Sequence, residues 1–263
     1  MLRKLLKYEI QATARIFLPM YALLIVFALL NKFFIAVNAD YLRIPQIISA
    51  TVFGVIIIGI CVMTLVVTIQ RYNKNLLADE GYLSFTLPVK IHSHIDCKMI
   101  VSLMWTVLSV LVSMVSIFVL AVNQNTIASL QEFFAACLDF LNRVGPGAYM
   151  VLLESLLLVV VGVLGQVLTI YASITVGNMS SKHKILLSIG TFLGFGVIEQ
   201  IVISILLTSF GGGYLNWVQE AAHSDQILAT QYLLLSLLIY ALVFGAAYYF
   251  LTNWMLKKKL NLE

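Results

Sequence analysis

Six long apolar stretches alternate with short polar segments along this chain. They comprise residues 16–37, 46–69, 99–122, 149–176, 185–208 and 227–255. Each is long enough to cross a lipid hydrocarbon core as a helix, which takes about 20 residues. The pattern therefore predicts an all-α membrane protein, with six transmembrane helices in a single domain that spans residues 1–263.

The N-terminal segment, residues 1–15, is too polar to form a span. Its apolar residues Leu2, Leu5, Leu6 and Ile10 recur near one helical face, with basic residues elsewhere. This pattern is typical of an amphipathic helix that lies in the membrane interface. A polar N-terminal extension of the first span is the alternative interpretation.

Two further segments favour short amphipathic helices on the outer side. Within residues 123–148, apolar residues recur at three- and four-residue steps up to Gly145-Pro146-Gly147, which would end the helix. Residues 214–222 follow the fifth span and begin with Tyr214 and Trp217. Aromatic side chains of this kind favour the membrane–water interface.

The longest polar interruption in the first half of the chain is the loop 70–98. It carries four basic residues, which favours the cytoplasmic side. Apolar residues such as Leu77, Phe85 and Leu87 interrupt its polar sequence. Such residues suit a loop that docks into a groove on another protein. They would equally suit a loop that packs under its own helices or lies among lipid headgroups.

Composition supports a polytopic membrane protein. Hydrophobic residues make up 61% of the chain and charged residues 11%, and the mean hydropathy is +0.99. A soluble domain carries roughly a quarter charged residues. The net charge of +4 does not indicate nucleic-acid binding, because the basic residues are spread over several loop ends. The N-terminus lacks the pattern of a cleavable signal peptide.

The distribution of Lys and Arg predicts the orientation. With both termini in the cytoplasm, 13 of the 16 basic residues lie inside, and Lys32, Arg43 and Arg143 lie outside. An excess of this size on one side favours six helices with both ends cytoplasmic.

Sequence motifs for covalent chemistry are missing. The chain contains no GxxxxGK[ST], HExxH or GxSxG pattern. Its three cysteines, Cys61, Cys97 and Cys137, are scattered and do not have metal-ligand spacing. We therefore expect a chain without catalytic residues, metal site or bound cofactor.

Two carboxylates, Glu154 and Glu199, fall inside predicted spans. A charged carboxylate there costs roughly 2.5 to 3.5 kcal/mol and has to be paired, neutral or in contact with water. Both are candidates for a substrate path, and a structural role is the alternative for each. Small residues spaced for close helix packing occur as Gly190 with Gly194 and as Ala241 with Gly245.

Two stretches resemble bacterial ABC-2 type transporter permeases. The segment 9–24, EIQATARIFLPMYALL, resembles the start of the first span in that family. The segment 76–105, LLADEGYLSFTLPVKIHSHIDCKMIVSLMW, resembles the family's loop between spans two and three, with its EGYL and TLP elements. The six-span architecture with an amphipathic N-terminus agrees over the whole chain.

The resemblance implies a permease dimer, homomeric or heteromeric, in a bacterial cytoplasmic membrane. The dimer would sit on two separate ATPase subunits that bind ATP and Mg²⁺. A coupling helix in the loop would contact the ATPase through Leu77, Glu80, Gly81, Tyr82, Phe85, Thr86, Leu87 and Pro88.

The expected function is therefore that of the membrane subunit of an ATP-driven exporter. Its substrate would be a peptide, a lipid or a drug-like molecule. A membrane sensor or scaffold of an ATPase complex is the alternative. A secondary carrier is disfavoured, because the chain lacks internally repeated halves.

Overall fold

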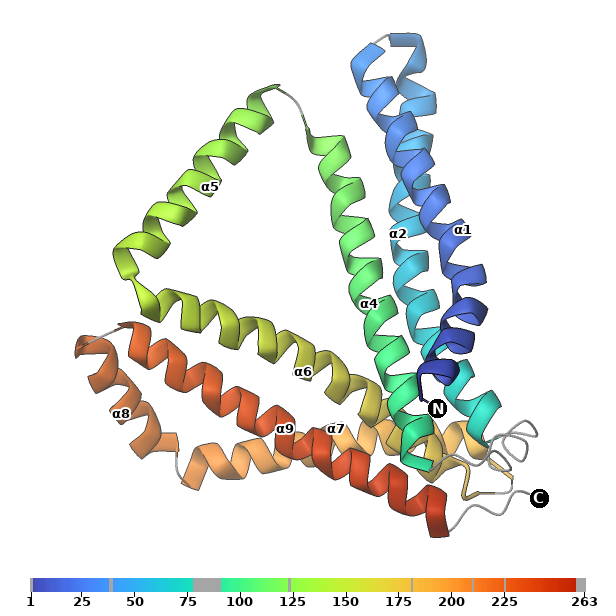
Figure 1. Ribbon diagram of the computed structural model, residues 1–263, viewed down its shortest axis with the longest axis vertical. Helices are drawn as coiled ribbons and strands as arrows, with labels where there is room; N and C mark the ends of the chain where they lie inside the picture. Colours follow the sequence, from blue (N-terminus) through green and yellow to red (C-terminus); the bar gives the residue numbers. More distant parts are fainter. Residues whose placement is uncertain are drawn as a thin grey trace. The chain divides into compact units, whose positions relative to one another are not determined.

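The computed structural model describes residues 2–37, 40–77, 91–122, 124–180, 182–209, 211–224 and 226–258. Within these residues nearly the whole chain is helical and no strand occurs (Figure 1). The α-helices are α1 (Leu2–Val37), α2 (Arg43–Tyr72), α4 (Ile91–Ala121), α5 (Gln124–Val144), α6 (Pro146–Gly177), α7 (Lys184–Ser209), α8 (Gly211–Ser224) and α9 (Gln226–Lys258). A 3₁₀ turn, η1 (Asp40–Leu42), precedes α2, and a π-helical turn, η2 (Asn73–Leu77), follows it.

Six of the described helices are long and apolar enough to cross a membrane, namely α1, α2, α4, α6, α7 and α9. Each overlaps one of the predicted spans, so the expectation of an all-α chain with six such helices is confirmed. Large apolar side chains are exposed along these helices. A soluble monomer rarely exposes contiguous apolar surface on this scale, whereas lipid would cover it. The structure thus indicates a multi-pass membrane protein.

Helix α1 runs without a break across the predicted boundary between residues 15 and 16. The sequence from Ile10 to Leu18 contains no glycine or proline that would end a helix. Pro19 is accommodated inside the helix. This continuity agrees with the alternative interpretation, in which residues 1–15 extend the first span.

Helical structure also extends into both ends of the predicted loop 70–98. Helix α2 continues to Tyr72 and is followed by η2, in which Leu76 and Leu77 are buried. Helix α4 already begins at Ile91. The central part of the loop, residues 78–90, lies outside the described residues.

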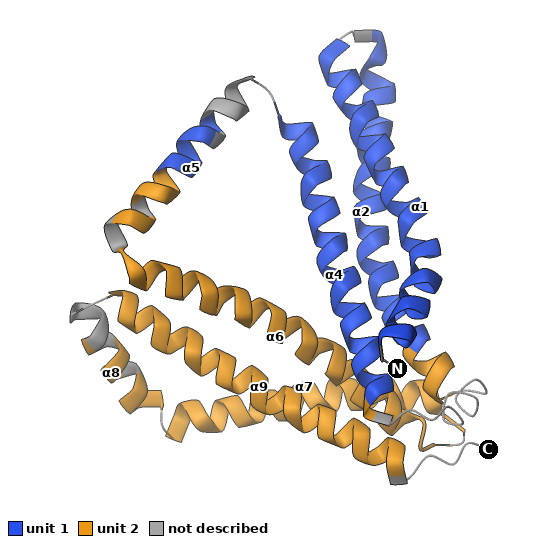
Figure 2. Ribbon diagram, viewed as in Figure 1, with its two compact units in different colours: residues 1–71, 93–135 blue, residues 72–92, 136–263 orange. Residues whose placement is uncertain are grey.

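The chain divides into two compact units (Figure 2). The first comprises residues 1–71 and 93–135, and its core joins α1, α2 and α4. Leu24 from α1 and Ile60 from α2 are fully buried there, beside Trp105 from α4. Some apolar side chains of these three helices are therefore buried between the helices and do not face lipid.

The second unit comprises residues 72–92 and 136–263. Helices α6 and α9 pack in parallel, with Gln231 Nε2 donating to the carbonyl oxygen of Gly147 at 3.4 Å near their N-terminal ends. Further along, Gly245 lies against Leu168, so this member of the small pair of Ala241 and Gly245 packs within the unit. Helix α8 packs on α9, with the rings of Trp217 and Tyr232 4.5 Å apart.

Two glycines shape the turns around α6. Gly145 has a φ of 74°, a left-handed conformation that an L side chain rarely adopts, and it separates α5 from Pro146 at the start of α6. This agrees with the predicted end of the amphipathic segment. At the other end, a Cβ on Gly177 would lie 1.9 Å from Ser188 Oγ and 2.7 Å from the Ser188 backbone nitrogen. Glycine therefore permits the close approach of α6 and α7.

Candidate functional site

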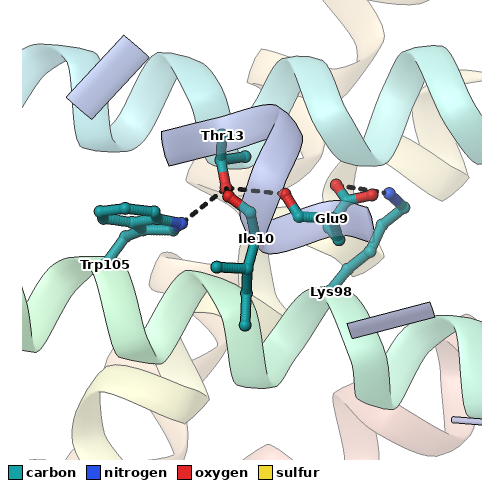
Figure 3. Close-up of polar contacts among 5 residues, drawn as sticks. All are labelled: Glu9, Ile10, Thr13, Lys98 and Trp105. Carbon is teal, nitrogen blue, oxygen red and sulfur yellow. Dashed lines mark hydrogen bonds and ion pairs between the residues drawn. The ribbon is translucent and has the colours of Figure 1, made fainter. Parts of the chain in front are cut away.

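A buried ion pair joins the start of α1 to the start of α4. Lys98 Nζ donates to Glu9 Oε1 at 3.1 Å, and the two side chains are only 7% and 13% exposed (Figure 3). Because little water reaches the pair, each charge relies on the other for its solvation. Lys98 lies in the first turns of the helix that leaves the loop, so the pair fixes this end of the loop to α1.

A hydrogen-bonded aromatic cluster continues from the ion pair. Thr13 Oγ1 accepts a hydrogen bond from Trp105 Nε1 at 2.7 Å and donates to the carbonyl oxygen of Glu9 at 2.8 Å (Figure 3). The rings of Phe17 and Trp105 stack with centroids 4.5 Å apart. The indole N–H is thus satisfied while the ring fills the core. The contacts attach α4 to α1 over two turns.

A second cluster lies where α2 enters the loop. Tyr72 and Tyr171 are fully buried and stack with ring centroids 4.0 Å apart. The hydroxyl groups of Tyr72 and Thr175 are hydrogen bonded at 2.6 Å. Beside them, Asn178 Nδ2 donates to Asn73 Oδ1 at 3.3 Å. These contacts fix the other end of the loop to α6.

Sequence reasoning did not predict either cluster. A usable signal exists for the ion pair, because Glu9 lies in the segment before the first predicted span, Lys98 directly precedes the third span, and their charges are opposite. The pairing itself links positions 89 residues apart, which no local periodicity reveals. For Tyr72, a polar aromatic residue at the end of a span is equally compatible with an interfacial position.

The predicted ATPase contact falls mostly outside the described residues. This applies to Glu80, Gly81, Tyr82, Phe85, Thr86, Leu87 and Pro88. Leu77 is described, and only 8% of it is exposed. Its side chain is therefore already covered by the chain itself.

Glu199 contacts α9 from its position on α7. Tyr248 donates its hydroxyl hydrogen to Glu199 Oε1 at 2.6 Å. The ring of Tyr248 lies 5.0 Å from that of Phe195, one turn before Glu199 on α7. The carboxylate thus has a hydrogen-bond donor within the same chain, in an aromatic setting.

Glu154 lies on α6 and is half-buried. Its Oε2 atom is buried without a hydrogen-bond partner among the described residues. The two predicted substrate-path carboxylates therefore differ, since Glu199 has a tyrosine donor and this oxygen of Glu154 has none. Among the described residues, no three His, Cys, Asp or Glu side chains are grouped in a way that could hold a metal ion.

Comparison with protein-family models, curated proteins and solved structures found no match for this chain.

Replacing Tyr248 by Phe is expected to destabilise the protein by about 0.6 to 1.7 kcal/mol, the range measured for hydrogen bonds between membrane helices. The reason is that Glu199 loses its donor in a low-dielectric setting. Glu199→Gln keeps an acceptor for Tyr248 and should cost less than Glu199→Leu. The free energy of unfolding is measured in detergent for these three variants. Tyr149→Phe, at an exposed position, is the control. Equal stability of Tyr248→Phe and the unmodified protein would contradict a contribution from this bond.

Proposed function

We propose that this chain is the membrane subunit of an ATP-driven exporter of the ABC-2 type. The observation that supports the proposal most is that the two stretches that resemble this family also contact each other in the structure. The stretches that resemble this family, residues 9–24 and 76–105, contribute Glu9, Thr13 and Phe17 on one side and Lys98 and Trp105 on the other. Residues within the two family-like stretches therefore hold α1 and α4 together.

In this proposal the loop transmits motion from separate ATPase subunits. ATP and Mg²⁺ bind to those subunits, and their closure displaces residues 78–90. The displacement reaches α1 through the pair of Lys98 with Glu9 and reaches α6 through the stack of Tyr72 on Tyr171. A second permease subunit completes the transport path, and the chain itself carries out no covalent chemistry.

The proposal also includes the orientation of the chain in the membrane and a path for the substrate. The excess of basic residues favours a cytoplasmic position for both termini and the loop, and the family resemblance implies a bacterial cell. Glu199 and Glu154 are the acidic groups available to a substrate that crosses the bundle. Glu199→Gln would then weaken transport or substrate-stimulated ATP hydrolysis while basal hydrolysis and assembly persist.

Purification of the tagged chain from its native membrane is expected to retain an ATPase with a GxxxxGK[ST] sequence. Glu80→Lys combined with Phe85→Asp should abolish this retention, because the pair of changes reverses a charge and removes an apolar anchor from the loop. Immunoblotting and mass spectrometry of the eluate measure the effect.

The matched control is Glu132→Lys combined with Phe133→Asp, the same residue types at exposed positions of α5. Membrane insertion should persist in both variants, and the control should keep the ATPase. Retention of the ATPase by the loop variant would refute the proposed contact. An ATPase that is retained but never stimulated by any transported compound would favour a sensor or scaffold.

A further inference from the structure

An apolar groove runs along the second unit between α6, α7 and α9. It has a volume of about 780 Å³, and its walls include Val176 from α6, Leu187 from α7 and Leu251 from α9. Pockets that bind small molecules typically have volumes of roughly 300 to 1,000 Å³ and mostly apolar walls. The groove therefore has the size and lining of a binding site.

The hollow arises from the composition of α7. None of the residues of α7 is buried, although the helix packs against α6. Gly190 and Gly194 line the groove, and a Cβ on either would meet nothing within 4 Å. The absent side chains leave a channel along the helix, and a long, thin apolar group fits such a channel.

The end of the groove near the start of α7 is basic. His183 lines it, and the exposed residues Lys182 and Lys184 flank His183 in the chain. Lys257 follows Trp254, another lining residue, by one helical turn. The sequence contains no Asp or Glu within residues 155–198 or 226–262. Positive charge at this end is therefore not compensated by acidic residues of the same segments.

We propose that this groove binds one anionic phospholipid. An acyl chain lies along Gly190 and Gly194, and the phosphate contacts Lys182, His183 and Lys184. Because α6, α7 and α9 are long enough to cross the membrane, lipid reaches the groove laterally. Clusters of Lys and Arg at the membrane surface attract anionic lipids by about 1 kcal/mol per residue. A zwitterionic lipid offers the same acyl chain without the net charge.

Native mass spectrometry of the full-length protein tests this directly. The probes are phosphatidylglycerol and phosphatidylcholine with identical acyl chains, added in equal amounts. The unmodified protein should retain phosphatidylglycerol at least about tenfold better. Lys182→Gln combined with Lys184→Gln should remove this preference, whereas the exposed control Arg43→Gln should keep it.

A second pair of variants tests the groove itself. Gly194→Leu fills the channel and should lower retention of both lipids. Gly196→Leu is the matched control, because this glycine of α7 does not line the groove and also has open space around it. Phosphatidylglycerol with brominated acyl chains should quench fluorescence in the unmodified protein more than in Trp254→Phe.

The absence of any preference for phosphatidylglycerol in the unmodified protein would overturn the proposal. So would equal lipid retention by Gly194→Leu and Gly196→Leu, which indicates unspecific lipid around the protein. Conversion of a dimer to a monomer by Gly194→Leu, without loss of lipid, would assign the groove to a second copy of the chain.

Discussion

Replacing Lys98 by Met is expected to lower the free energy of unfolding by about 3 to 5 kcal/mol, the usual cost of removing one partner of a buried ion pair. The reason is that Glu9 would remain in a site where only 13% of its side chain is exposed. Met keeps the length and apolar packing of the lysine stem, so the effect reports mainly the lost charge. Chemical denaturation in detergent measures the change.

A double-mutant cycle separates the ion pair from simple packing. Glu9→Gln combined with Lys98→Met leaves no isolated charge and should restore part of the stability, because an apolar or neutral replacement of both partners is often nearly neutral. Lys7→Met provides a control on the exposed face of α1. Strictly additive effects of the two single changes would show that Glu9 and Lys98 do not stabilise one another.

The pair also has a functional consequence under the proposed mechanism. If the loop transmits motion to α1 through Lys98, Lys98→Met should reduce transport per ATP hydrolysed at a temperature at which the complex stays folded. Equal coupling in the variant and the unmodified protein would limit the pair to a structural role.

The sequence predicts the spans well because their signal is local. Each apolar stretch is bounded by charged or turn-forming residues, and the observed ends of α6 and α7 lie within a few residues of the predicted limits. The boundary at residue 15 has a charged residue, Arg15, but no glycine or proline that would end a helix. Polarity changes there without a helix breaker, and a change of polarity alone does not end a helix.

The contacts between helices could not be predicted in the same way. An isolated Glu or Lys at the end of a span can face water, lipid headgroups or a partner, and the choice depends on the rotation of each helix. Thr13 illustrates the difficulty, because its role depends on the position of Trp105, 92 residues further along. Glu199 was recognisable as a carboxylate in need of a partner, but the sequence did not identify Tyr248.

The stack of Tyr72 on Tyr171 is the counterpart of the ion pair at the other end of the loop. Both side chains are fully buried, and the Tyr72 hydroxyl has Thr175 as its partner. Loss of either ring would open a cavity where the loop begins. The start of the loop would then no longer be fixed to α6, whereas Lys98 would still fix its end to α1.

Tyr171→Ala is therefore expected to lower the free energy of unfolding by about 3 kcal/mol. This is the lower end of the range for truncating a buried aromatic residue, because transfer from water contributes less inside a membrane. Tyr72→Phe keeps the stack and loses one hydrogen bond, so it should cost only about 0.5 to 1.5 kcal/mol. Phe250→Ala, on the exposed face of α9, is the control and should have a smaller effect than Tyr171→Ala. Denaturation in detergent ranks the three variants. Under the proposed function, ATP-driven transport then tests coupling in those that assemble. An effect of Tyr171→Ala no larger than that of Phe250→Ala would show that the stack does not hold the loop to α6.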